Sequence, residues 1–100
     1  MAVTNHPVTD YTAVVDSATQ FLDVREPAEL VEGTLPGAIN LPLGQLPTRV
    51  AELDRDRRVV VFCRSGGRSG HAAMLLADGG FTDVVNLDGG MLAYSATGWN

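Results

Sequence analysis

The chain has 100 residues, of which 45% are hydrophobic and 19% charged, and its formal net charge is −5 at neutral pH. This length suits one domain with its own core and is too short for two ordinary domains. The composition excludes a disordered chain, and the acidic balance argues against nucleic acid as a partner. We therefore expect a single globular domain over residues 1–100.

The apolar runs and the single cysteine bear on where the protein works. No apolar run approaches the ~20 residues of a membrane span, and the start, MAVTNHPVTD, lacks the charged and apolar regions of a signal peptide. One cysteine cannot form an internal disulfide, so nothing in the sequence demands an oxidising compartment. We expect a cytoplasmic protein with no membrane partner.

The first half of the chain alternates between strand-like and helix-like segments. In order, these are a weak strand near Pro7–Thr9, a helix from Asp10 through Ser17, a strand at Gln20–Val24, a helix at Glu26–Glu32 and a strand at Ala38–Leu41. Asp10 can cap the first helix, and Pro27 suits the first turn of the second. A third helical stripe follows at Leu46, Val50 and Leu53.

The second half of the chain has the clearest elements. In order, these are a strand at Val59–Cys63, a helix at Arg68–Gly79, a strand at Val84–Leu87 and a short helix at Gly89–Ala96. Apart from the weak first one, the strands are apolar almost throughout instead of alternating, which is typical of strands covered on both faces of a parallel sheet. Strands and helices that alternate at this spacing predict an α/β domain with a mainly parallel sheet.

The stretch CRSGGRS, residues 63–69, follows the most apolar strand directly. In open α/β sheets, ligands bind beyond the carboxyl ends of the strands, so a binding site is expected here. Gly66 and Gly67 can take positive φ, which lets successive N–H groups turn inward around an anion. The N-terminus of the next helix adds more N–H groups, and Ser69 can cap this helix or offer its hydroxyl to a ligand.

The only cysteine, Cys63, lies at the start of this loop. Loop amides, the helix dipole, Arg64 and Arg68 would all lower the pKa of its thiol and would hold an anionic substrate against it. A buried core cysteine is the plainer interpretation, since free cysteine packs as a small hydrophobic residue. Polar residues and glycines fill the next five positions, however, and core packing does not need them. We therefore predict that Cys63 is a nucleophile.

Other chemistries find little support in the sequence. The chain has no lysine, which excludes Schiff-base chemistry, and no spacing of Cys, His, Asp or Glu suggests a metal. His6 lies near the chain terminus, and His71 lies early in the long helix, where a surface or capping role is expected instead of a general base. We expect no cofactor and no metal.

Four segments in order carry a resemblance to a known family. They are FLDVREPAELVEG, PGAINLPL, VVVFCRSGGRS and GFTDVVNLDGGMLAY, and the resemblance covers nearly the whole chain, from about residue 8 to residue 98. In this order and spacing they resemble the rhodanese family of sulfurtransferases. The resemblance implies one rhodanese-like domain over residues 1–100, with a central parallel sheet of about five strands and helices on both faces.

The resemblance also implies roles for particular residues. Cys63 would be the catalytic residue that carries sulfur, and the loop after it would supply amides and charge for the donor anion. The substrate-binding residues would be Arg64, Ser65, Gly66, Gly67, Arg68 and Ser69. Asp23 and Arg25 match the family's D-x-R near the site, and we expect them to support it by tying the end of their strand to the loop.

Two positions depart from the family pattern. The family usually has a histidine where Thr34 stands, in G-H-x-P-G-A, and it often has a tryptophan where Tyr94 stands. Neither position is the nucleophile. These departures bear on the shape of the pocket and the choice of acceptor, and not on the chemistry.

The reaction implied is covalent sulfur transfer through a persulfide on Cys63. The donor would be a small anion such as thiosulfate, and the acceptor would be cyanide or a thiol, including a protein thiol. One alternative is a persulfide carrier or a regulatory binding module for a dedicated partner. A second alternative is a cysteine phosphatase, whose loop resembles C-x5-R. Because the spacing from Cys63 to Arg68 is C-x4-R, one residue shorter, the sequence favours sulfur transfer.

Overall fold

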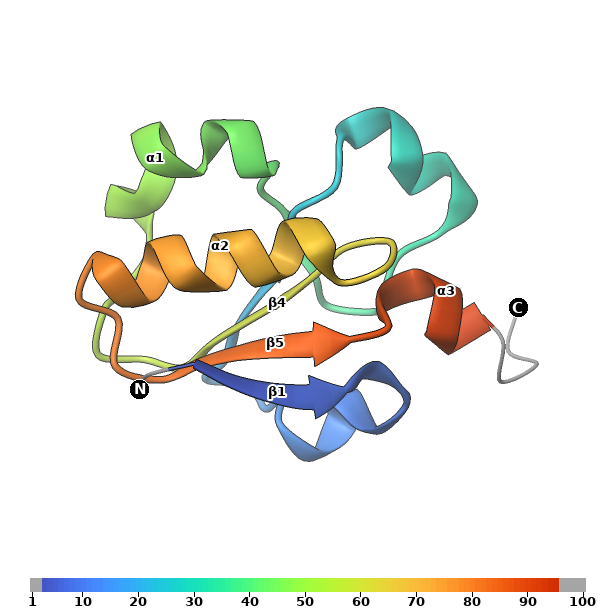
Figure 1. Cartoon of the computed structure of the whole chain (residues 1–100), viewed down its shortest axis with the longest axis horizontal. Coiled ribbons are helices and arrows are strands. Elements are labelled where there is room, and N and C mark those ends of the chain that lie inside the picture. The colour runs from blue at the N-terminus through green and yellow to red at the C-terminus, as the bar shows by residue number, and fades with distance from the viewer. Residues whose placement is uncertain (1–2, 96–100) are drawn as a thin grey trace.

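A computed structural model describes residues 3–95 of the chain, which form a five-stranded parallel sheet in the order β1–β5–β4–β2–β3. The strands are β1 Val3–Pro7, β2 Gln20–Asp23, β3 Ile39–Asn40, β4 Val59–Phe62 and β5 Val84–Asp88. Helices cover both faces of this sheet (Figure 1). The predicted α/β class and the parallel sheet of about five strands are confirmed.

Within residues 3–95, six helices lie between the strands and a seventh follows the last strand; most of them are short. The α-helices are α1 Leu46–Arg49, α2 Gly67–Asp78 and α3 Gly90–Ser95. The 3-10 helices are η1 Val8–Ala13, η2 Pro27–Glu32, η3 Leu43–Gln45 and η4 Val50–Glu52. In this part of the chain, no helix has both the length and the apolar character that a membrane span requires.

The core has two layers, one on each face of the sheet. Leu46 of α1 and Leu76 of α2 pack with the side chains on one face. Val8 of η1 and Met91 of α3 pack with those on the other face. Every residue of β4 is wholly buried, because successive side chains of this central strand enter opposite layers. This two-sided burial explains why the sequence of β4 is apolar without alternation.

The first strand lies earlier than the sequence predicts. β1 spans Val3–Pro7, where the prediction placed a weak strand near Pro7–Thr9, and η1 begins at Val8 instead. β1 forms the edge of the sheet and pairs with β5 alone within the described residues. Its sequence, VTNHP, is largely exposed, so no apolar run marks it.

Three further predictions of element length were wrong. The helix expected from Asp10 through Ser17 ends at Ala13, and Asp10 itself has non-helical backbone angles. The stripe expected at residues 46–53 is divided between α1 and η4, and Leu53 follows the end of η4. β3 has only two residues, where Ala38–Leu41 was expected. The helix expected at Gly89–Ala96 forms as α3, and its last predicted residue, Ala96, lies outside the described residues.

Candidate active site

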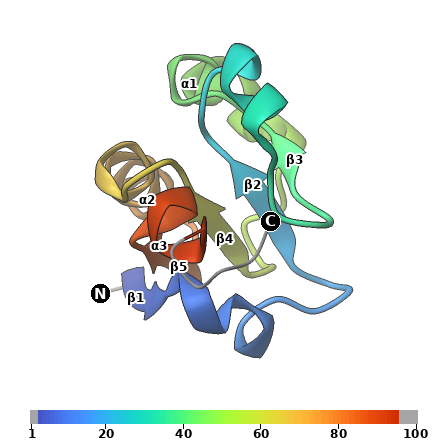
Figure 2. The ribbon, with the colours of Figure 1, turned by 90° about the vertical axis from the view of Figure 1, so that its right-hand side faces the viewer.

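The carboxyl ends of the strands define one edge of the sheet, which faces the viewer in Figure 2. Cys63 follows the last residue of β4 directly, and the loop at residues 63–66 leads into α2. β2 lies beside β4 and ends at Asp23, opposite Phe62. The structure therefore brings Cys63 and the predicted Asp23–Arg25 segment to the same edge.

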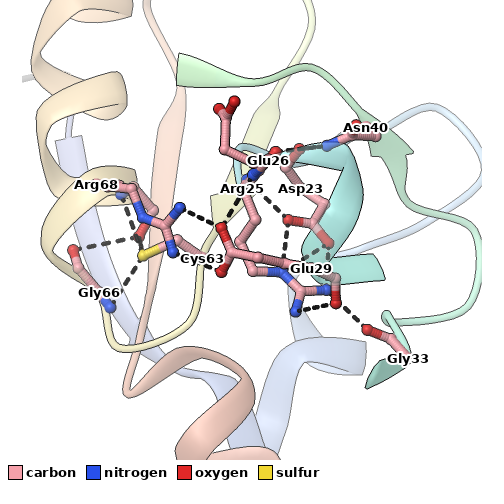
Figure 3. Close-up of polar contacts among 10 residues, drawn as sticks. Asp23, Arg25, Glu26, Glu29, Gly33, Asn40, Cys63, Gly66 and Arg68 are labelled. Carbon is pink, nitrogen blue, oxygen red and sulfur yellow. Dashed lines mark hydrogen bonds and ion pairs between the residues drawn. The ribbon is translucent and has the colours of Figure 1, made fainter. Parts of the chain in front are cut away.

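The Cys63 sulfur lies among polar groups of its own loop. Its Sγ accepts hydrogen bonds from the backbone N–H groups of Gly66 at 3.1 Å and Ser69 at 3.4 Å, and it contacts the Ser69 hydroxyl at 3.4 Å (Figure 3). Gly66 takes a φ of 114°, in the region that favours glycine, and this turns its N–H toward the sulfur. The Ser69 hydroxyl also donates to the Gly66 carbonyl at 3.2 Å. The polar groups of the loop therefore lie around one atom, the Cys63 sulfur.

These contacts decide the ionisation of the thiol. Burial raises the pKa of Cys63, which is 1% exposed. The hydrogen bonds of the Ser69 side chain and of the backbone N–H groups of Ser69, Gly66 and Ser65 outweigh burial, so the pKa lies below its ordinary value. The shift has the direction that the loop sequence predicts. A thiol of this kind is a better nucleophile at neutral pH than an ordinary cysteine.

The start of α3 holds the cysteine loop from the other side. The backbone N–H groups of Met91 and Leu92 donate to the carbonyls of Cys63 at 3.0 Å and Arg64 at 2.9 Å. Gly90 allows this approach because a Cβ there would overlap the Cys63 carbonyl and lie 2.7 Å from the backbone of Arg64. Gly90 is not among the predicted site residues, although the pair of glycines after β5 is visible in the sequence.

The two arginines of the loop have different surroundings. Arg64 is exposed, and its side chain makes no hydrogen bond or ion pair with residues 3–95. Arg68, in the first turn of α2, is held by both carboxylate oxygens of Glu29, at 2.6 and 2.9 Å. Glu29 belongs to η2, and Figure 3 shows the pair beside the Cys63 sulfur. Glu29 is not among the predicted site residues, because no local sequence pattern connects positions that lie 39 residues apart.

The ion pair is maintained at neutral pH. The hydrogen bonds from Arg68 lower the pKa of Glu29 to about 2, against a smaller opposing effect of burial. The pKa of Arg68 is raised, chiefly by the same hydrogen bonds. Both groups are therefore charged across the range in which the protein would work.

The remaining loop residues, Ser65 and Gly67, lie at the exposed rim. The Ser65 N–H helps to lower the pKa of the thiol, and Gly67 begins α2 with open space where a Cβ would be. Of the predicted loop residues, Ser65, Gly66 and Ser69 thus direct backbone N–H groups at the Cys63 sulfur. Arg64 and Gly67 lie at the exposed rim, and Arg68 is paired with Glu29.

Asp23 and Arg25 form a buried ion pair at the end of β2, and each is 1% exposed. The Arg25 guanidinium donates to both carboxylate oxygens of Asp23 at 2.7–3.1 Å and to the Gly33 carbonyl at 2.7 Å. The Asn40 side chain donates to the carbonyls of Asp23 and Arg25 at 2.9 and 2.8 Å. This network connects the end of β2 to the segment around β3. Among residues 3–95, no cluster of three or more Cys, His, Asp or Glu could hold a metal.

The two positions that depart from the family pattern lie in well-packed surroundings. The Thr34 hydroxyl donates to Asp23 at 2.8 Å, so it contributes to the buried network. Tyr94 lies on α3 and packs edge to face against Tyr11, with ring centroids 5.9 Å apart. Within the described residues, the Thr34 hydroxyl makes no hydrogen bond to the Cys63 sulfur.

Comparisons with known proteins agree with this architecture. The model of the rhodanese-like domain family matches residues 9–97. Over 77 residues, or 77% of this chain and 72% of the relative, the chain is 43% identical to a sulfurtransferase of Allochromatium vinosum. It is 35% identical over 81 residues to the thiosulfate sulfurtransferase PspE of Escherichia coli, covering 79% of this chain and 78% of that protein.

A solved structure supports the same assignment. The rhodanese-related protein of Thermoplasma volcanium superimposes with a TM-score of 0.75 at 35% identity, over 83% of this chain and 82% of that one. The family match thus extends over most of the chain and is accompanied by similarity in both sequence and structure. The chain belongs to the family of rhodanese-like domains.

Proposed function

We propose that this protein is a sulfurtransferase that moves a sulfane sulfur from thiosulfate or a similar donor to a thiol or cyanide through a persulfide on Cys63. One observation carries the proposal. The Cys63 sulfur accepts backbone N–H hydrogen bonds at 3.1 and 3.4 Å, and these bonds help to lower its pKa despite burial. Relatives named as sulfurtransferases support the same class of reaction.

In the first half of the reaction, the Cys63 thiolate attacks the outer sulfur of thiosulfate. A new S–S bond forms, the S–S bond of thiosulfate breaks, and sulfite leaves with the electron pair. No proton has to be removed once the thiol is ionised, so the step needs no general base. The charge of the new persulfide is stabilised by N–H groups that already face the sulfur, as at Gly66.

In the second half, an acceptor removes the outer sulfur. Cyanide or a thiolate attacks it, the S–S bond to Cys63 breaks, and the thiolate of Cys63 is restored. The products are thiocyanate or a persulfide of the acceptor. The Arg64 side chain is exposed at the mouth of the loop and has no partner within residues 3–95, so it can meet anionic donors and acceptors.

Intact mass spectrometry tests the proposal directly. After incubation with thiosulfate, the protein should gain one sulfur atom, and cyanide should remove it with release of thiocyanate. Cys63→Ser should abolish both events. Sulfur loading that survives Cys63→Ser would contradict the assignment. Loading of the parent without turnover by cyanide or small thiols would instead favour a carrier that serves one dedicated partner.

The length of the loop separates this reaction from phosphate transfer. Four residues lie between Cys63 and Arg68, one fewer than in the C-x5-R loop of a cysteine phosphatase, and the N–H of Gly66 already lies 3.1 Å from the sulfur, which favours an anion smaller than a phosphoryl group. We therefore expect negligible hydrolysis of aryl phosphates. Inserting one glycine between Gly66 and Gly67 should widen the loop and weaken persulfide formation. Efficient phosphatase activity in the parent would overturn the argument from loop length.

A further inference from the structure

The positive charge around Cys63 is smaller than the loop sequence suggests. Of the two loop arginines, Arg68 donates to both oxygens of Glu29 at 2.6 and 2.9 Å, so its charge is balanced. Arg25 is also nearby, but Asp23 neutralises it within the buried network. Only Arg64 presents a guanidinium without an ionic partner at this edge of the described structure.

The position of Glu29 is fixed by its own helix. Glu26 precedes η2, and its backbone N–H donates to Glu29 Oε1 at 3.1 Å, while the Glu26 side chain accepts from the Glu29 N–H in return. The Arg25 guanidinium also reaches the Glu29 carbonyl at 3.4 Å. The Glu29 carboxylate is therefore held across the loop by contacts that do not depend on Arg68.

We propose that Glu29 is a specificity-determining residue, which withdraws the charge of Arg68 from the donor and so disfavours dianionic sulfur donors relative to donors of lower charge. The proposal rests on the proposed sulfur transfer and adds a donor class to it. A fixed carboxylate beside the reacting sulfur repels each negative charge of the donor, so a dianion loses more than a monoanion. Sulfur donors with one negative charge are the class that this site fits.

Two donors that differ in charge and share the same chemistry provide the test. Thiosulfate carries two negative charges and leaves as sulfite after Cys63 takes its outer sulfur. Methanethiosulfonate carries one and leaves as methanesulfinate after the same attack and the same S–S cleavage. The ratio of kcat/KM for thiosulfate to kcat/KM for methanethiosulfonate isolates the effect of donor charge. Changes in the ionisation or reactivity of Cys63 affect both donors alike and cancel in the ratio.

The variant of choice is Glu29→Gln. Glutamine keeps the size of the side chain and can accept the same N–H of Glu26, so η2 should retain its start. Removing one charge from the partly solvated mouth of the site should raise the thiosulfate to methanethiosulfonate ratio by about three- to tenfold, and less at high salt. Glu29→Ala, a second neutral variant, should shift the ratio in the same direction.

Two controls test whether the change in the donor ratio comes from the Glu29–Arg68 pair. Glu52→Gln on η4 removes the same charge and breaks a similar pair with Arg49 of α1, at 3.0 and 3.1 Å, and it should leave the ratio unchanged. Adding Arg68→Gln to Glu29→Gln should return the ratio to within about twofold of the parent, because the freed guanidinium is then gone.

The outcomes are distinct. A ratio that stays within about twofold of the parent in both Glu29 variants, while Cys63 still takes up sulfur, overturns the role of Glu29 and leaves the sulfurtransferase proposal standing. A raised ratio that persists after Arg68→Gln is added also overturns it. If neither donor loads Cys63 in the parent, the proposed function fails, and this inference fails with it.

Discussion

The ends of β2 and β4 lie side by side at one edge of the sheet. The polar groups after β4 surround a single reactive atom, whereas those after β2 pair with one another. After β4, the groups that surround Cys63 are mostly backbone N–H groups and one hydroxyl. The N–H groups and the hydroxyl all lie around the Cys63 sulfur, and the rim of the loop at Ser65 and Gly67 is exposed. Such an arrangement can stabilise the negative charge of an anionic substrate as well as that of the thiolate.

After β2, the polar groups are side chains that satisfy one another. Asp23 and Arg25 form an ion pair in which each residue is 1% exposed, and Thr34 and the Gly33 carbonyl complete its hydrogen bonds. The Asn40 side chain donates to the backbone carbonyls of the same two residues. No charge is left over for a ligand. We infer that the end of β4 carries the chemistry while the end of β2 carries stability, so changes at the two ends should have different consequences.

The most damaging change should be Gly90→Ala, which affects the support of the cysteine loop. The new Cβ would overlap the carbonyls of Cys63 and Arg64, and alanine would also have to take the φ of 54°. We expect a loss of about 4–5 kcal/mol in the free energy of unfolding, because backbone atoms cannot move aside as a flexible side chain can. Urea unfolding measures the loss, and thiosulfate loading of any folded fraction should be strongly reduced.

Gly44→Ala is the matched control for that substitution. Gly44 lies in η3, its φ is not in the left-handed region, and a Cβ there meets nothing within 4 Å. Its effect on stability should stay within about 0.5 kcal/mol. Equal effects of the two substitutions would show that the contact between α3 and the loop does not matter for stability.

The second largest effect should come from Asp23→Asn at the end of β2. Asparagine keeps the shape of the side chain but leaves the buried Arg25 guanidinium without a counter-charge. We expect a loss of about 3 kcal/mol in the free energy of unfolding, as for other buried pairs that lose one partner. The folded variant should still take up sulfur on Cys63. Selective loss of sulfur loading with normal stability would place Asp23 in the chemistry and contradict the comparison.

Much of the central sheet and of the cysteine loop could be predicted from the sequence. The apolar runs gave the central strands, and the glycines after Cys63 predicted a loop of inward N–H groups, because both signals are local. The edge strand β1 was misplaced because it is polar and pairs on one side only. Partners that come from distant segments could not be predicted either, as shown by Glu29 beside Arg68 and by Gly90 against the cysteine loop. Such contacts depend on the assembled sheet, and no local pattern encodes them.

Ser69→Ala should alter the ionisation of Cys63 at a moderate cost in stability. The hydrogen bond with the Ser69 side chain makes the largest contribution to lowering the pKa of the Cys63 thiol, so removing this side chain should raise that pKa. Alkylation of Cys63 by iodoacetamide should then have its inflection at a higher pH and be slower at neutral pH. The lost bond to the Gly66 carbonyl should cost about 1 kcal/mol.

Ser65→Ala serves as the control for the alkylation experiment. The Ser65 residue is exposed, and it acts on the thiol through its backbone N–H, which alanine retains. The inflection should therefore stay where it is in the parent. An inflection of the parent at or above the value of a free cysteine, about 8.5, would mean that the loop does not activate the thiol.

The smallest effect should come from Thr34→Val, which removes one hydrogen bond from the network after β2. Valine has the shape of threonine, and the lost bond is the 2.8 Å donation to Asp23. Asp23 still accepts from the Arg25 side chain and backbone, so its charge remains satisfied. We expect a loss of about 0.5–1 kcal/mol in the free energy of unfolding, with sulfur loading within about twofold of the parent. Thr48→Val, which removes an exposed bond to the Gln45 carbonyl, should cost less than about 0.5 kcal/mol. A change in donor or acceptor preference in Thr34→Val, without a change in stability, would show that the end of β2 contributes to the pocket and not only to the fold.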